Sequence, residues 1–256
     1  MRQRTYCNAY VVLLTATIDP GLYGKDLARN NAQLRIEDYQ HSLKFWMGIS
    51  DPRIRGIVFC ENSGADLNAF KERARNSTIP IEFLSFDGNS KPAGVHYGWS
   101  ELGIIDHAIQ ESSLIAECQY FIKATGRLRF PRISKLLDST NTDFDAIVDH
   151  RKKYKGESGC HTRARTQLML FSKAFYEGHF LDARDEMLGK CSHIEEFIAA
   201  KLISLQEGPK IIRRFPVECP PVGITGWKGD SYQSKSNRAK NAARSLMRKL
   251  VPWVWV

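Results

Sequence analysis

The sequence predicts an α/β protein with a mainly parallel sheet flanked by helices and a separate amphipathic helix at the C-terminus. Strand-like apolar segments alternate with helical patterns through the first half of the chain. Polar residues follow each of those strands, and the net charge gathers in the last 48 residues. With 256 residues, 43 % of them hydrophobic and 25 % charged, the chain has the composition of a globular protein with a substantial core.

The first half of the chain predicts four strands and three helices. Residues 10–18, YVVLLTATI, are a continuous apolar run, as expected of a central strand that is buried on both faces. We expect the first strand here rather than a signal peptide, because no small-residue cleavage pattern follows the run. The expected strands are 10–18, 54–60, 81–86 and 120–124, and the expected helices are 36–47, 67–74 and 102–116.

The second half gives weaker signals. A convincing apolar stripe lies within 180–205, and the segment 167–176 fits either a strand or a helix. The remaining expectations are a short helix at 133–137, a strand at 146–149, a polar loop at 151–165 and an irregular segment at 215–223. We therefore expect one domain over residues 1–233, with a ligand-binding half to residue 130 and a substrate-side half after it, followed by a tail over 234–256.

The charge and the cysteines limit the function classes. Residues 209–256 hold ten Lys or Arg and two acids, a net charge of +8, whereas the other 208 residues sum to +1. A nearly neutral body argues against a nucleic-acid-binding core, which would carry its own basic face. The six cysteines show no CxxC spacing, which argues against a disulfide framework or a zinc site and favours the reducing cytoplasm.

The tail predicts a basic amphipathic helix over 237–251. Apolar residues recur at helical spacing on one face, and the other face includes Arg244, Arg248 and Lys249. Trp253 and Trp255 follow directly after a proline. This pattern is typical of an anchor in a membrane interface, and the concentration of charge favours that interpretation over a last helix docked on the protein's own core.

Several common motifs are absent from the sequence. No GxGxxG follows the first strand, and GxxxxGK[ST], GxSxG and HExxH do not occur, so a Rossmann dinucleotide site and a P-loop lack support. Polar residues nevertheless follow all four strands that are expected to be parallel. Because ligands of open α/β sheets bind at the carboxyl ends of strands, these residues predict a nucleotide-type site, although each one alone also fits a helix cap. They are Thr15 and Thr17, Glu61 to Ser63, Asp87, and Thr125 to Arg127.

The stretch CQYFIKATGRLRF, residues 118–130, is central to this interpretation. Gly126 would let the backbone approach a ligand closely, and the planar guanidinium of Arg127 suits a phosphate or carboxylate. The alternative is that Gly126 merely turns the chain and Arg127 is structural.

Several strings resemble a group of bacterial glycosyltransferases with a GT-A-like, Rossmann-type fold, encoded in O-antigen and capsule biosynthesis clusters. The resemblance covers most of residues 8–230, and KxTGR and ENSG are its more specific parts. The strings are VVLLTATIDP, IVFCENSGAD, IEFLSFDGN, SELGIIDHAI, FIKATGRLRFP and GITGWKGDSY.

The resemblance implies sugar transfer from a nucleotide-sugar donor, with a UDP-sugar expected first, to a lipid-linked glycan at the inner face of the cytoplasmic membrane. It places Thr15, Thr17, Glu61 and Asn62 at the nucleotide, and Lys123 with residues 125–127 at the diphosphate. The glycine loop departs from the family pattern, since Val95 and His96 stand where Lys and Gly are expected, while Glu101 matches the family acid.

Metal use stays open on the sequence alone. GT-A enzymes usually hold Mn²⁺ or Mg²⁺ through a DxD motif at a strand end. The one literal DxD, Asp143 to Asp145, precedes the expected strand at 146–149, and Asp149 ends it. Thr-Gly-Arg stands at the usual strand end, so Lys123 and Arg127 could neutralise a leaving diphosphate, and metal independence is slightly favoured.

The candidate bases for an acceptor hydroxyl are Glu195, Asp182, Asp185 and Glu101. Glu195 also fits a plainer role at the N-terminus of an apolar helix, where a carboxylate complements the helix dipole. The alternative to an enzyme is a noncatalytic, membrane-peripheral α/β protein that binds a nucleotide or a partner through the same sheet edge.

Overall fold

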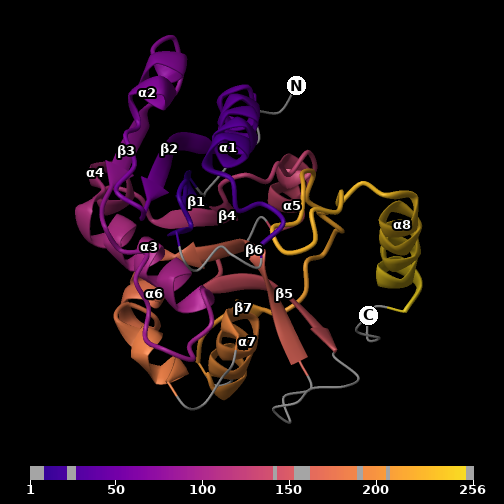
Figure 1. Ribbon diagram of the computed structural model, residues 1–256. Helices are drawn as coiled ribbons and strands as arrows, with labels where there is room; N and C mark the ends of the chain where they lie inside the picture. Colours follow the sequence, from indigo (N-terminus) through magenta and orange to yellow (C-terminus); the bar gives the residue numbers. More distant parts are fainter. Residues whose placement is uncertain are drawn as a thin grey trace.

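A mixed sheet forms the centre of the computed structural model, which describes residues 9–21, 27–140, 143–152, 162–188, 193–205 and 208–251 (Figure 1). Its strand order is β3-β2-β1-β4-β6-β5-β7. Strands β1 to β4 are parallel, β6 runs antiparallel to β4 and β5, and β7 is parallel to β5. The strands are β1 (Tyr10–Ala16), β2 (Ile54–Glu61), β3 (Ile81–Ser85), β4 (Tyr120–Thr125), β5 (Ala146–Lys152), β6 (Thr162–Ser172) and β7 (Ile211–Ile212).

Helices cover both faces of this sheet (Figure 1). Tyr10, Val12 and Leu14 of β1 pack into the core beneath α1, whereas Val11 and Leu13 pack into the opposite core beneath α3 and α7. Because successive strand side chains point to opposite faces, burial on both faces explains the unbroken apolar run of β1. The helices are α1 (Ala32–Met47), α2 (Asn68–Ala74), α3 (Gly98–Glu111), α4 (Ser113–Ala116), α5 (Ile133–Asp138), α6 (Lys173–His179), the 3₁₀ helix η2 (Ala183–Met187), α7 (Ile194–Ser204) and α8 (Lys235–Leu250).

The mainly parallel α/β sheet with flanking helices and a C-terminal helix confirms the predicted fold class. The predicted polar loop at 151–165 was wrong at both of its described ends, because β5 extends to Lys152 and β6 begins at Thr162. The polar start of β6 is stable as a strand since Arg163 pairs with Glu196 and Arg165 pairs with Glu218. The predicted helix at 102–116 is interrupted at Ser112, whose side chain accepts from the N–H of Ile115 and caps α4.

Helix α8 stands at the edge of the molecule, beyond β5 (Figure 1). Its Arg248 is buried and donates from Nε to Glu218 at 2.9 Å and from Nη2 to Asp149 at 2.8 Å. The expectation that Arg248 faces a membrane was therefore wrong, because its charge is neutralised inside the protein. Arg244 is half-buried on this same inward face, whereas Lys249 is exposed. Trp253 and Trp255 lie outside the described residues.

None of the described helices is long and apolar enough to cross a membrane.

Candidate active site

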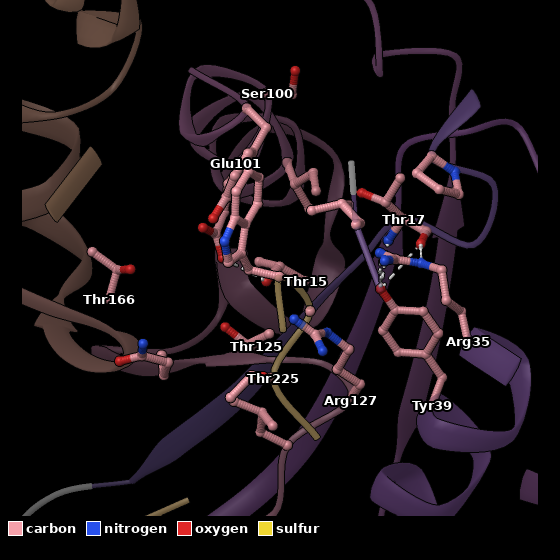
Figure 2. Close-up of a pocket in the computed structure, with 18 of the residues that line it drawn as sticks. Thr15, Thr17, Arg35, Tyr39, Ser100, Glu101, Thr125, Arg127, Thr166 and Thr225 are labelled. Atoms are coloured by element: carbon pink, nitrogen blue, oxygen red, sulfur yellow. Dashed lines mark hydrogen bonds between the residues drawn. The ribbon is translucent and has the colours of Figure 1, made fainter. Parts of the chain in front are cut away.

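A cavity of about 230 Å³ lies at the carboxyl ends of β1 and β4 (Figure 2). It combines segments that are far apart in the sequence: the two strand ends, the first turns of α3 and α7, the side of α1, and a loop near residue 226. Its polar lining includes Thr15, Thr17, Arg35, Tyr39, Asn89, Ser100, Glu101, Thr125, Arg127, Thr166, Gln167, Glu195 and Thr225. The carboxyl edge of the parallel strands is thus the site edge, as the polar strand ends predicted.

Gly126 holds the two strand ends together. Its N–H donates to the carbonyl of Thr15 at 2.8 Å, and a Cβ at position 126 would stand only 2.7 Å from that carbonyl oxygen. A larger residue would push the ends of β1 and β4 apart, so the glycine is needed for close backbone approach. This contact sets Thr125 and Arg127 beside Thr15 at the cavity wall.

The Arg127 guanidinium projects into the cavity (Figure 2). Its Nη1 donates to the carbonyl of Ile224 at 2.7 Å, and a Cβ at Gly226 would meet Nη2 at 2.5 Å. The guanidinium therefore lies close against the backbone of the loop that carries Gly226, which fixes the direction of its planar fork. A fixed fork of N–H donors suits the bidentate recognition of a phosphate or a diphosphate.

A second arginine, Arg35 of α1, anchors the segment that leaves β1. Its Nε donates to the carbonyl of Thr17 at 2.6 Å and its Nη2 to the hydroxyl of Tyr39 at 3.1 Å. Thr17 itself is tied to Asn62, with 2.6 Å between Oγ1 and the amide oxygen. Sequence reasoning missed Arg35, because this residue precedes the helix expected at 36–47 and an arginine there carries no signal that it turns toward a site.

Lys123 is fully buried and pairs with Glu101, which lies in the first turn of α3. Its Nζ lies 2.5 Å from Glu101 Oε1 and donates to the carbonyl of Thr166 at 2.7 Å. The predicted role of Lys123 at a donor diphosphate is therefore wrong, since the ammonium does not line the cavity and its charge is already neutralised. Its role is to hold the Glu101 carboxylate at the cavity wall.

We expect Lys123→Met to lower the free energy of unfolding by about 3 kcal/mol, because it removes one partner of a buried ion pair. This loss is at the low end of the range for breaking a buried ion pair, because the Glu101 side chain is 18 % exposed and water can partly solvate its charge. Urea denaturation followed by circular dichroism measures the loss.

The exposed Lys44→Met on α1 is the matched control and should shift stability by no more than about 0.5 kcal/mol. The double variant Lys123→Met/Glu101→Gln should recover part of the lost free energy of unfolding, because it leaves no unpaired charge. An unfolding midpoint for Lys123→Met equal to that of the unaltered protein would contradict the pairing.

The N-termini of α3 and α7 pack against each other beside the cavity. A Cβ at Gly98 would lie 2.5 Å from the Cβ of Ile194, and the rings of His96 and His193 contact each other at a tilt of 42°, with 4.4 Å between centroids. Burial, with a smaller contribution from His193, lowers the pKa of His96 to about 4, so this ring is neutral at pH 7. The packing brings two carboxylates to one cavity, Glu101 from α3 and Glu195 from α7.

Glu195 has the features of a general base. Its Oε2 is buried and accepts no hydrogen bond from the described residues. Burial raises the pKa of Glu195, and the neighbouring Glu101 carboxylate adds to the effect. A desolvated carboxylate is suited to accept a proton from a bound hydroxyl when its pKa is raised and one of its oxygens accepts no other hydrogen bond.

Other predicted site residues lie away from the cavity. Glu61 was expected to contact a nucleotide, but its carboxylate accepts from the N–H groups of Ile18, Ser63 and Ala65 at 2.8 to 3.1 Å and fixes the turn after β2. Asn62 is also fully buried behind Thr17. Asp182 and Asp185, expected as bases, belong to the segment around η2, and neither lines the cavity.

The three weak metal candidates do not face the cavity either. Asp143 and Asp145 lie at the start of β5, which is the opposite edge of the sheet, and Asp145 accepts from the N–H of Lys210 at 2.7 Å. Asp149 is buried in the ion pairs of Arg248. Among the described residues no three His, Cys, Asp or Glu side chains gather as metal ligands. The described lining therefore does not fit a divalent-cation centre of the DxD type.

No protein-family model and no curated protein sequence matches this chain. Solved structures with a similar course of the chain include three enzymes of low sequence identity. A 4-diphosphocytidyl-2C-methyl-D-erythritol synthase from Anaerococcus prevotii is 10 % identical, with TM-score 0.47 and coverage of 93 % of this chain and 96 % of that one. Mouse xyloside xylosyltransferase 1 is 11 % identical, with TM-score 0.45 and coverage of 80 % and 84 %.

Core-mannan synthase A from Aspergillus fumigatus, solved in a Mn/GDP form, is 7 % identical, with TM-score 0.42 and coverage of 77 % of this chain and 68 % of that one. Because each of these TM-scores is below 0.5, we base the functional proposal on the topology and cavity of this chain.

Proposed function

We propose that this protein is a GT-A-like glycosyltransferase that uses a nucleotide-sugar donor. One observation supports it above all: a single cavity at the carboxyl ends of parallel strands is lined by both the Arg127 guanidinium and the half-buried Glu195 carboxylate. A cation for a leaving diphosphate and a base for an entering hydroxyl are the two groups that a direct sugar transfer needs. The resemblance of KxTGR and ENSG to bacterial glycosyltransferases agrees with this assignment.

In the proposed reaction, an acceptor hydroxyl attacks the anomeric carbon of the donor sugar. The bond from that carbon to the diphosphate oxygen breaks with its electron pair, while the acceptor oxygen forms the new bond and its proton passes to Glu195. Arg127 stabilises the negative charge that develops on the departing nucleoside diphosphate. Lys123 keeps Glu101 in place, and the Arg35–Tyr39 pair fixes the segment after β1.

The acceptor that we propose is a lipid-linked glycan of bacterial surface polysaccharide synthesis, and the donor is a hexosyl nucleotide with UDP as the first choice. The support for these finer assignments is the sequence resemblance. The aromatic side chains of Tyr97 and Trp227 are exposed at the cavity, at 47 % and 59 %, and offer faces on which a sugar could pack.

A panel of UDP, GDP and CMP in thermal-shift assays tests the donor site. We expect one nucleoside diphosphate to raise the melting temperature of the unaltered protein, and the shift to shrink in Arg127→Ala. Slow hydrolysis of the matching nucleotide-sugar would distinguish an enzyme from a noncatalytic nucleotide-binding protein. No shift with any of the three would contradict the donor site itself.

A further inference from the structure

We propose that the outward face of α8 binds the surface of an anionic lipid bilayer. The observation is the orientation of the helix, which turns its polar side to the protein and its apolar side to solvent. Arg248, Arg244 and Asn237 face the body, where Asn237 Nδ2 donates to the carbonyl of Ser231 at 3.2 Å and Arg248 is buried between two carboxylates. An ordinary surface helix buries its apolar stripe instead.

The apolar stripe lies directly opposite this docked face. At 100° per residue, Ala239, Ala242, Ala243, Leu246 and Leu250 fall on the side of the helix away from Arg248. All five are exposed, with Leu246 at 57 % and Leu250 at 66 %. These leucines are two of the six large hydrophobic side chains that are most exposed among the described residues.

Positive charge flanks the stripe. Arg238 and Lys249 lie on one side of it and Lys240 on the other, and Lys235 stands in line with the stripe at the N-terminus of the helix. All four are exposed, and no Asp or Glu occurs between residues 231 and 256. A short apolar stripe bordered by cations is the arrangement of a helix that lies in a membrane interface, where leucines enter the acyl boundary and lysines meet anionic headgroups.

The same charges argue against a second copy of the chain as the occupant of this face. Two α8 helices packed stripe to stripe would place the four exposed cations of each copy beside those of the other, with no acid on the helix to offset them. A helix of 16 residues is also only about 24 Å long, which gives much less contact than the roughly 800 Å² per partner of a stable interface.

The docked Arg248 makes the face rigid. Its carboxylate partners, Asp149 at the end of β5 and Glu218 before the cavity loop, hold α8 in one orientation on the body. Burial opposes ionisation of Asp149, but Arg248, Arg165 and Arg151 outweigh it and lower the pKa of Asp149 below its ordinary value. Asp149 therefore stays ionised at any pH above the acid range, and its ion pair with Arg248 keeps the stripe facing outward.

Vesicle sedimentation of the full chain without any nucleotide tests this surface, so its outcome is separate from that of the proposed transferase activity. We expect binding to phosphatidylcholine vesicles that contain phosphatidylglycerol, little binding to phosphatidylcholine alone, and weakening by salt. The double variant Leu246→Glu/Leu250→Glu should bind at least about tenfold more weakly, since each exposed leucine contributes on the order of a tenfold factor when buried.

Leu34→Glu on α1 is the matched control, because Leu34 is also exposed, at 39 %, and is remote from α8 in the sequence. It should leave vesicle binding unchanged, and circular dichroism should show that all variants are folded. Undiminished binding of the double variant would overturn the proposal. So would a concentration-dependent dimer that the double variant loses in the absence of vesicle binding, because a second copy would then be the occupant.

Discussion

Glu195→Gln is expected to lower kcat by about 10²–10⁴-fold, the range for loss of a general base, while the affinity for UDP stays near that of the unaltered protein. The amide is similar in size and keeps the packing of the α7 N-terminus, but it accepts no proton from an acceptor hydroxyl. Initial rates of sugar transfer, with nucleotide affinity from calorimetry, measure the two quantities separately.

The pH profile gives a second readout of the same residue. Burial, joined by the charge of Glu101, raises the pKa of Glu195 above the ordinary glutamate value of about 4.3. The base acts only when deprotonated, so kcat should fall as the pH drops through this raised pKa. The acid limb should vanish in Glu195→Gln.

Glu177→Gln on α6 is the matched control, because Glu177 is exposed and does not line the cavity. It should retain full activity and the same pH profile. If Glu195→Gln kept both the rate and the acid limb, Glu195 would be no more than a residue that complements the α7 dipole.

Arg127→Ala is expected to reduce kcat/KM by on the order of 10²–10³-fold, because a preorganised donor to the leaving diphosphate is lost. Arg127→Lys should recover only part of the loss, since an ammonium keeps the charge but not the planar fork that Gly226 and the Ile224 carbonyl orient. Steady-state kinetics with a nucleotide-sugar measure both variants.

Arg129→Ala is a control from the same loop, because Arg129 is not part of the cavity that holds Arg127 and Glu195. It should leave kcat/KM near its normal value. Adding EDTA to the unaltered protein should also leave most of the proposed activity, since the described lining does not fit a DxD-type centre. Complete loss of activity in EDTA, restored by Mn²⁺, would show that Arg127 does not replace a metal.

The parallel half of the fold could be predicted because its signals are local. Apolar runs, helical periodicity and polar strand ends each depend on neighbouring residues, and the parallel direction of β1 to β4 follows from their alternation with helices. The antiparallel β6 was harder to predict, since its polar start pairs with the end of β5, and its Arg163 and Arg165 form ion pairs with residues far along the chain.

The site was predicted in part for the same reason. Thr15, Thr125 and Arg127 stand at strand ends and do line the cavity. A sequence does not show which way a polar side chain turns. Lys123 and Glu61 were therefore expected to contact a ligand, although both side chains form hydrogen bonds inside the protein. Arg248 was expected to face a membrane but is buried against two carboxylates. The sequence of an amphipathic helix does not show that one of its basic residues has buried carboxylate partners.

A crystal structure of the protein soaked with UDP and Mn²⁺ tests the donor site most directly. We expect the nucleotide in the cavity between the ends of β1 and β4, with diphosphate oxygens within hydrogen-bonding distance of the Arg127 guanidinium and Glu195 facing the open space beyond them. A nucleotide bound elsewhere, or a diphosphate held by Mn²⁺ on Asp143, Asp145 or Asp149 with Arg127 untouched, would contradict the proposed site.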